Sequence, residues 1–452
     1  MTPNNHPNHP NRRAFLGQSA RSLGLASLAS SGLLSLSAPV QAATADYKAL
    51  VCVFLPGGND GDNTIVAREA SRVKAYNAIR GSSGLALSGA NLMSTRASGD
   101  QAFAFNAQLS ALDNLYGQGK VAVVLNTGNL AKPLTKAEYQ AGAAVPGELF
   151  SHPDQQVQAH AGLAAASATG WGGRLLDALG TGRPLDAIAI GSAGMFVQGN
   201  IHASNLVPET GDLVLNGFNF WPQKEADQRM DALKKILAND SGHRVANAAN
   251  KALSDGMALA KLLKTAATEP LAASFPGTSL GNQLKVAAQL IAYNAKQGPG
   301  RQVFYASLPG FDTHGSQAWA HADLLGKLSA ALSAFQTAIT AAGLDKQVTL
   351  FTASEFGRTF SPNSSGTDHG WGSHSVVMGG AVKGGVYGQF PAFVLGGPDD
   401  ATTRGTWIPT IGHQQIGATL GKWFGADAAA LNTTVFPGEL KNFSTPDLGF
   451  MG

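Results

Sequence analysis

Ala49 to Thr64 read ALVCVFLPGGNDGDNT, and this stretch decides the fold. It opens with a run of apolar residues, which is typical of a strand buried on both faces. A Pro-Gly-Gly turn then leads into Asn59, Asp60 and Asp62. Because ligands of open α/β sheets bind outside the carboxyl ends of the strands, polar residues in this position are candidate ligands.

Two later segments repeat this arrangement. QVFYASL (302–308) leads into Asp312 and His314, and QVTLFTA (347–353) leads into Glu355. Because the carboxyl ends of parallel strands meet at one edge of a sheet, we expect these side chains to lie close to Asp60.

The remaining chain alternates between strand and helix patterns. Further apolar runs that predict buried strands are VAVVLN (121–126), DAIAIG (186–191) and SVVMGG (375–380). Helical patterns cover 105–120 and 318–343, the second of which ends at Gly343. The sequence therefore predicts an α/β fold with a mostly parallel central sheet sandwiched by helices. The helix-rich region at about 224–298 is interpreted as a helical insertion or as two more covering helices.

The N-terminus has the features of a removable export signal. Arg12 and Arg13 precede a mildly apolar run, and VQA at 40–42 is a small-residue cleavage site. The paired arginines favour the twin-arginine export machinery as a partner, and therefore a periplasmic or secreted protein. An ordinary secretory signal or an anchor helix is the alternative. We expect 1–42 to be the signal and 43–452 to form a single α/β domain.

Charge and cysteine content narrow the remaining possibilities. The signal holds Arg12, Arg13 and Arg21 and no acid, so the formal net charge of +3 falls to zero in the rest of the chain. Net charge therefore predicts no nucleic-acid partner. No later segment is apolar for long enough to predict a membrane span after signal removal. The single cysteine, Cys52, cannot form an internal disulfide and is expected to be buried.

The acids at the strand ends predict a metal site. Crowded carboxylates repel one another unless a cation lies among them or protons are retained. Mixed Asp, Glu and His ligands suit a divalent metal such as zinc, manganese or calcium. In the glycine-rich loop TDHGWGSH (367–374), His369 is expected to complete the site, with His374 as the less favoured choice and Asp368 orienting the imidazole. Helix caps and turns are the plainer interpretation of each acid taken alone.

Several motifs together resemble the DUF1501 family. They are FLPGGNDGDNT, LFSHPDQQ, GWGGRL, GFDTHGSQ, SEFGRT with GTDHGWG, and the late WIP and ATLGKWFG. The resemblance implies a bacterial protein exported by the twin-arginine route and a fold of the alkaline phosphatase/sulfatase-like superfamily.

The resemblance also implies a set of metal ligands. Asp60 resembles the first acid of the superfamily, with Asn59 able to share its role. Asp312 and His314 resemble one metal-binding pair, and His369 resembles the final histidine. Glu355 stands where phosphatases have an Asp followed by His, but here Phe356 follows it.

The catalytic residues implied are fewer. Ser151 has the Ser-x-Pro outline of a sulfatase nucleophile, although Gln155 replaces the expected Arg and Ser151 has the plain interpretation of a helix cap. Thr64 is the second candidate nucleophile, with a turn hydroxyl as its simpler role. Arg358 is expected either to hold the anionic ester oxygens or to form a structural ion pair.

Two functions follow from these expectations. The first is an exported, metal-dependent hydrolase of phosphate- or sulfate-type esters, with a small anionic ester as substrate. The second is a non-catalytic exported binding or assembly protein with a degenerate metal site. Three histidines in helical patterns, namely His152, His160 and His321, are expected to be surface or hydrogen-bonded residues.

Overall fold

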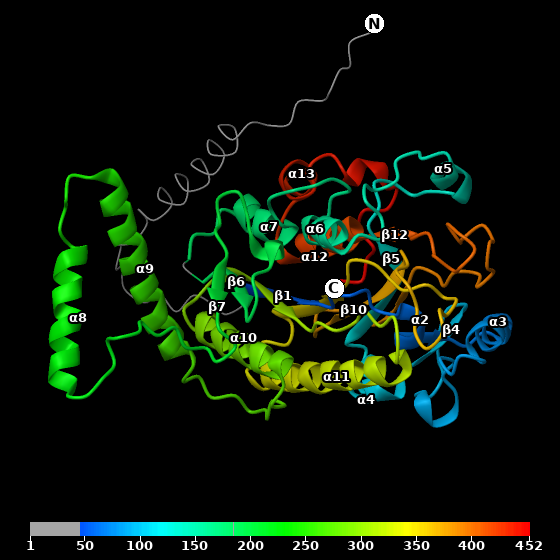
Figure 1. Ribbon diagram of the computed structural model, residues 1–452, viewed down its shortest axis with the longest axis horizontal. Helices are drawn as coiled ribbons and strands as arrows, with labels where there is room; N and C mark the ends of the chain where they lie inside the picture. The colour runs from blue at the N-terminus through cyan, green and yellow to red at the C-terminus, as the bar shows by residue number, and fades with distance from the viewer. Residues whose placement is uncertain (1–45, 184) are drawn as a thin grey trace, which may run out of the picture. The chain divides into compact units, whose positions relative to one another are not determined.

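The computed structural model describes residues 46–183 and 185–452 and is shown in Figure 1. The predicted signal, 1–42, lies outside the described residues. Contacts divide the chain into two units. The larger holds the described part of 41–213 together with 263–452, and the described part of the smaller is Val214–Leu262.

Nine strands within the described residues of the larger unit form one sheet. Their order is β11-β5-β10-β9-β1-β8-β6-β7, with β12 paired to β5. The bounds are β1 (Tyr47–Phe54), β5 (Val121–Gly128), β6 (Ala187–Ile190), β7 (Asn205–Val207), β8 (Gly300–Ser307), β9 (Val348–Ala353), β10 (Ser373–Met378), β11 (Gly385–Tyr387) and β12 (Ile411–Gly412). Among the strands described for this sheet, only the pairs made by β10 are antiparallel. The predicted strands are all present, and the predicted mostly parallel α/β sheet is confirmed.

The register of the central strands aligns their carboxyl ends. Phe54, the last residue of β1, pairs with Ser307 of β8 and with Ala353 of β9. The loops that follow these three strands therefore leave the sheet at the same edge. Because β10 runs in the opposite direction, the loop before Ser373 arrives at this edge as well.

Helices cover both faces of the sheet, as Figure 1 shows. On one face lie α4 (Ser110–Gly117), α10 (Ser279–Ala295) and α11 (Gln317–Ala341), and on the other lie α6 (His152–Ala161), α7 (Trp171–Leu179) and α12 (His413–Phe424). Leu50, Cys52 and Phe54 of β1 are buried in a core shared with Trp171 of α7. Gly343 adopts a left-handed φ of 72° just beyond α11, as expected of a helix stop.

Smaller elements complete the larger unit. A separate sheet joins β2 (Ile65–Ala67), β4 (Gln101–Phe105) and β3 (Arg96–Ser98) in that order. The short helices are α2 (Gly61–Thr64), α3 (Ala70–Arg80), α5 (Lys136–Gln140) and α13 (Ala428–Ala430).

The helix-rich region predicted at about 224–298 contains three helices. They are α8 (Gln223–Leu237), α9 (Arg244–Ala266) and α10. Helix α10 belongs to the larger unit, where it packs against β8 and α11, so only part of this region lies outside the unit of the sheet. Within the described residues, the helices include none that is long and apolar enough to cross a membrane.

Candidate metal centre

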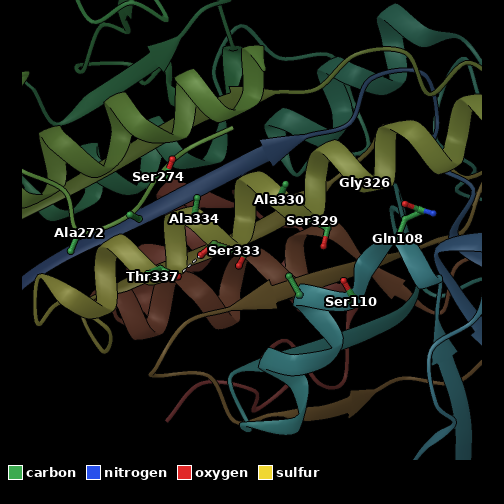
Figure 2. Close-up of a pocket in the computed structure, with 12 residues that line it drawn as sticks. Gln108, Ser110, Ala272, Ser274, Gly326, Ser329, Ala330, Ser333, Ala334 and Thr337 are labelled. Atoms are coloured by element: carbon green, nitrogen blue, oxygen red, sulfur yellow. Dashed lines mark hydrogen bonds between the residues drawn. The ribbon is translucent and has the colours of Figure 1, made fainter. Parts of the chain in front are cut away.

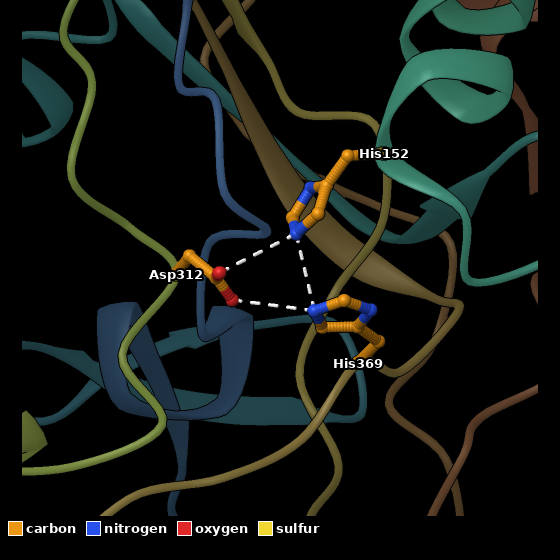
Figure 3. A group of neighbouring side chains, drawn as sticks. All are labelled: His152, Asp312 and His369. Atoms are coloured by element: carbon orange, nitrogen blue, oxygen red, sulfur yellow. Dashed lines mark hydrogen bonds and ion pairs between the residues drawn. The ribbon is translucent and has the colours of Figure 1, made fainter.

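Three histidines and one aspartate meet at the carboxyl edge of the sheet. Asp312 and His314 lie in the loop after β8, and His369 lies in the loop before β10. His152 is the first residue of α6. Figure 3 shows His152, Asp312 and His369 facing one another from these separate parts of the chain. These four residues are called the cluster below.

Local sequence explains how the loops approach so closely. A Cβ at Gly57, whose φ is 117°, would lie 2.2 Å from the amide nitrogen of Asp312. A Cβ at Gly370 would lie 2.5 Å from the carbonyl carbon of Arg358, opposite which His369 forms an isolated β-bridge. Only glycine permits both contacts, so the glycines position the acidic and histidine loops side by side.

The start of α6 places His152. Ser151 has an extended backbone at the N-cap, and Pro153 lies in the first turn, where a missing amide hydrogen has no cost. The helix therefore begins at His152 and directs this side chain toward the strand ends.

The donor atoms of the cluster lie at ligand spacing. Nε2 of His369 is 3.1 Å from Nε2 of both His152 and His314. Oδ1 of Asp312 is 2.9 Å from Nε2 of His314 and 3.3 Å from Nε2 of His369, and Oδ2 is 3.5 Å from Nε2 of His152. In a tetrahedral zinc site with ordinary bond lengths, neighbouring donors are about 3.3 Å apart.

Each imidazole is oriented through its other nitrogen. Nδ1 of His152 lies 2.8 Å from Oε1 of Glu355, and Nδ1 of His314 lies 3.2 Å from Oδ1 of Asp368. Nδ1 of His369 lies 2.8 Å from the carbonyl oxygen of Phe150. Carboxylate and carbonyl oxygens accept hydrogen bonds, so each Nδ1 carries the proton and each Nε2 presents its lone pair to the centre of the cluster.

This arrangement could hold a cation. Neutral imidazoles with Nδ1 protonated have no hydrogen between their Nε2 atoms, and lone pairs at 3.1 Å repel one another. Burial lowers the pKa of His369 below its usual value, although its bond to the Phe150 carbonyl opposes the shift. The lowered pKa keeps His369 in the neutral form that a metal ligand needs.

Asp312 is held in its charged form. Burial raises the pKa of Asp312, but the hydrogen bond and charge of Arg358 outweigh burial and bring the pKa below its usual value. Nη1 of Arg358 lies 2.7 Å from Oδ1 of Asp312. The side chains of Asp312 and His314 are 45% and 46% exposed, so one side of the cluster is open to solvent.

Asp60 and Asn59 depart from the expected arrangement. The carboxylate of Asp60 pairs with Arg80 at 2.8 Å and accepts a hydrogen bond from Gln317. Oδ1 of Asn59 accepts hydrogen bonds from Thr64 and His321. The strand end brings both residues to the correct edge, but a buried arginine supplies the positive charge that a metal was expected to provide.

Glu355 and His374 also have other contacts. Glu355 is fully buried behind His152, where it accepts hydrogen bonds from the amide of Gly57 and from Gln156, so it contacts the outer nitrogen of this ring and not the centre of the cluster. His374 is buried at the start of β10, where Nδ1 accepts a hydrogen bond from the Asn126 amide and Nε2 lies 3.7 Å from Asp62. Asp368 orients His314 and not His369.

The predicted hydroxyls and arginine have clear local partners. Ser151 donates a hydrogen bond of 2.5 Å to Asp154. Thr64 is buried and bonds to Asn59 and to the Asp60 carbonyl, which is the turn role expected of it. The guanidinium of Arg358 is buried against Asp312, Gly57 and Thr367, which is the structural alternative predicted for it.

His152 is the member of the cluster that sequence reasoning missed. Its helical pattern predicted a histidine that is at the surface or hydrogen-bonded within the fold. The pattern does not show whether the side chains of the first helical turn face the sheet edge or the solvent. The motif LFSHPDQQ contained the signal, because His directly after a cap and before Pro places the ring at a helix entrance. Phe356 packs against both His369 and His152, with ring centroids 4.8 Å apart in each case.

A separate hollow offers no comparable chemistry. Figure 2 shows this cavity of about 560 Å³, whose lining includes Ser329, Ser333 and Thr337 of α11. Its lining residues carry no charge and include no histidine. The cluster is therefore the better candidate for a reactive site.

Comparison with known proteins gives a family but no activity. A search of curated proteins finds no match. Among solved structures, the chain is similar to Ps i-CgsB, with a TM-score of 0.38 and 10% identity over 88% of this chain and 77% of that one. It is similar to the lipoteichoic acid synthase LtaP from Listeria monocytogenes, with a TM-score of 0.34 and 10% identity over 92% and 81%. It is also similar to the PsFucS1 sulfatase from Pseudoalteromonas sp., with a TM-score of 0.34 and 10% identity over 90% and 73%. Scores at this level support no argument about activity.

The sequence match is more extensive. Residues 47–417 match the family described as "Protein of unknown function (DUF1501)". This range contains every residue of the cluster and most of the chain, and the protein therefore belongs to the DUF1501 family.

Proposed function

We propose that the protein is a metal-dependent hydrolase of phosphate- or sulfate-type esters. The observation that carries the proposal is the convergence of three Nε2 atoms and one carboxylate, with every Nδ1 held by an oxygen acceptor. Oxygen acceptors behind metal-bound histidines fix the tautomer and the ring orientation that a metal needs. The open side of the cluster leaves room for a substrate, as catalytic metal sites require.

The donor set favours zinc. Imidazole nitrogen suits zinc and similar transition metals, whereas calcium prefers a shell of oxygen atoms. His152, Asp312 and His369 have donor atoms that all lie within 4.8 Å of one another, and His314 adds a further nitrogen next to His369. Manganese is the second choice, because only one ligand of the cluster is a carboxylate.

The protein's own groups would perform distinct tasks. A divalent cation in the cluster supplies Lewis-acid polarisation of an ester oxygen. His152, Asp312 and His369 would hold that cation, with His314 beside it. Glu355 would keep His152 aligned, and Arg358 would keep Asp312 aligned. Phe356 covers the rings of His152 and His369 and would exclude water from that side.

Ser151 remains the proposed nucleophile. It directly precedes His152, and its hydroxyl already donates to Asp154. Asp154 would accept the hydroxyl proton as the Ser151 oxygen bonds to the phosphorus or sulfur and the bond to the ester alcohol breaks, and water would then release the phosphate or sulfate from Ser151. Thr64 is too deeply buried for this role. Water activated at the cluster is the alternative nucleophile.

The setting of this activity is part of the proposal. Paired Arg12 and Arg13 support export by the twin-arginine route, and hence a periplasmic or secreted enzyme acting on a small anionic ester.

A second function is favoured by one observation. The hydroxyl of Ser151 bonds to a neighbour in its own helix turn, and its geometry is equally that of an ordinary helix start. A non-catalytic exported binding or assembly protein with a degenerate metal site would need no nucleophile at this position.

A single experiment separates these functions. The protein purified from its native host is analysed for metals. It is then assayed with para-nitrophenyl phosphate, para-nitrophenyl sulfate and methyl para-nitrophenyl phosphate. Stoichiometric zinc with hydrolysis, both lost in Asp312→Ala, would support the hydrolase. Stoichiometric zinc without hydrolysis, or a stable protein without metal, would favour the non-catalytic binding or assembly protein and contradict the hydrolase. Asp323→Ala, which removes an exposed partner of Lys327, is the matched control.

A further inference from the structure

We propose that the metal-loaded cluster selects esters carrying one negative charge, namely sulfate monoesters or phosphodiesters, over phosphate monoesters carrying two. This inference rests on the proposed function and names the substrate class of the same site. The inference depends on whether any arginine near the cluster is free to bind the anionic group of the substrate.

Arg358 cannot serve an incoming anion. Its Nε donates to the Thr367 hydroxyl, its Nη1 donates to Asp312 and to the Gly57 carbonyl, and its Nη2 donates to the Thr367 carbonyl. The side chain is 0% exposed. These bonds use four of the five N–H groups of the guanidinium, and a substrate oxygen could reach the fifth only if the packing around this fully buried side chain opened.

The other arginines at this edge are also paired. Arg404 is bonded to Asp368, the carboxylate that orients His314. Arg80 is fully buried against Asp60. Among the described residues, each arginine that contacts Asp312, Asp368 or Asp60 is therefore already paired with a carboxylate. The metal ion would then be the positive charge that balances the substrate.

The cluster and the charged side chains that contact it carry a small net charge. The carboxylates that belong to the cluster or contact its histidines are Asp312, Glu355 and Asp368, and their arginine partners are Arg358 and Arg404. Asp154, which accepts the hydrogen bond of Ser151, is exposed to solvent and is left out of this count. Three negative and two positive charges leave one negative charge. A divalent cation turns this into one positive charge, which a single negative charge on the substrate balances. A second negative charge would remain uncompensated at a half-buried site, where charges interact more strongly than in water.

Two substrate chemistries share this single charge. Sulfate monoesters and phosphodiesters are both monoanionic tetrahedral esters, and the cluster gives no reason to separate them. A phosphate monoester carries nearly two charges above neutral pH. Assays with the matched aryl esters distinguish the three.

The test combines turnover with binding. The zinc-loaded protein is assayed at mildly alkaline pH with para-nitrophenyl sulfate, methyl para-nitrophenyl phosphate and para-nitrophenyl phosphate. Binding of phenylphosphonate and of its monomethyl ester, which carries one charge fewer, is measured by calorimetry. We expect kcat/KM and affinity to favour at least one monoanion by about tenfold or more over the matched dianion.

Two charge variants test the cause. Asp368→Asn removes one negative charge and should narrow the preference for the phosphonate monoester, whereas Arg404→Gln removes one positive charge and should widen it. Shifts in opposite directions cannot both arise from a loosened cluster. Asp323→Asn, at an exposed position of α11, should leave the preference unchanged.

The outcomes separate the two proposals. Preferred turnover and binding of the dianion would overturn the charge inference and leave the hydrolase intact. Tighter binding of the monoanion without turnover of any ester would support charge selection and reject hydrolysis. An unchanged preference in both variants would overturn the inference, as would failure of both phosphonates to bind.

Discussion

Glu355 lies behind His152, with its Oε1 2.8 Å from Nδ1 of the imidazole and its side chain fully buried. The same carboxylate accepts hydrogen bonds from the Gly57 amide and from Gln156. It is therefore anchored by the loop after β1 and by α6 at once. This contact joins the sheet edge to the helix that carries His152.

Replacing Glu355 with Gln should weaken metal binding without removing it. An amide can still meet His152, but it attracts the Nδ1 proton less strongly and no longer favours one ring orientation. Losses of this kind cost about 10- to 100-fold in metal affinity. Competition with a chelator measures the change, and Glu225→Gln, on exposed α8, is the control. An unaltered zinc affinity would show that Glu355 does not orient a ligand.

The two histidines of the sequence that differ most from expectation should behave oppositely. His152→Ala removes a donor of the cluster and should abolish stoichiometric zinc binding with little loss of stability, because its side chain is 27% exposed. His374→Ala should retain zinc but unfold more easily, because His374 is buried and its Nδ1 accepts a hydrogen bond from the backbone amide of Asn126. Elemental analysis with thermal unfolding decides this. Retention of zinc by the first variant and loss by the second would restore His374 as a ligand.

Asp60→Asn should affect stability and not metal content. The side chains of Asp60 and Arg80 are 1% and 0% exposed, so the variant leaves a buried guanidinium without its counter-charge. Removing one partner of such a pair costs about 3 to 5 kcal/mol. Denaturant unfolding gives the free energy, while the zinc content of the folded fraction should remain one per chain. Loss of zinc from a folded variant would return Asp60 to the ligand set.

Buried His160 should make the protein sensitive to acid. Burial, followed by the charge of His413, lowers the pKa of His160 to about 3, whereas the unfolded chain binds this proton near 6.5. Between these pH values only the unfolded state is protonated, so the free energy of unfolding falls as pH drops below 6.5. At about pH 5 this one histidine lowers the free energy of unfolding by about 2 kcal/mol.

A phenylalanine at position 160 removes this titration. Its ring should fit, because His160 packs 4.4 Å from Phe54 and 5.3 Å from Tyr305 between ring centroids. Between neutral pH and about pH 5, the free energy of unfolding of His160→Phe should fall by about 2 kcal/mol less than that of the parent protein. Denaturant titrations at both pH values measure the difference, and exposed His243→Phe should behave like the parent. Equal acid sensitivity of His160→Phe and the parent would contradict the account.

The sheet edge could be predicted from sequence because two simple rules act together. The apolar runs 49–55, 302–308 and 347–353 identify strands, and parallel strands end at one edge. That reasoning placed Asp312 and His314 correctly and brought the TDHGWGSH loop to them. The antiparallel direction of β10, which the sequence did not predict, makes the end of this loop meet the same edge.

The roles of individual residues could not be predicted in the same way. Asp60 follows its strand as Asp312 does, but Arg80 comes from α3, whose sequence gives no indication that it faces inward. His152 comes from a helix start, where the direction of the first side chain depends on packing against the sheet. Sequence patterns locate strand ends, whereas side-chain partners from distant elements decide which acid binds a metal and which binds an arginine.

Anomalous diffraction at the zinc edge, from crystals of the zinc-loaded protein, tests the central claim most directly. We expect one zinc ion per chain, bonded to Nε2 of His152 and His369 and to the carboxylate of Asp312, with Nε2 of His314 beside it. Glu355 should remain on Nδ1 of His152, without direct contact to the ion. Zinc located at Asp60 or His374, or no zinc between the imidazoles at saturating concentration, would contradict the account.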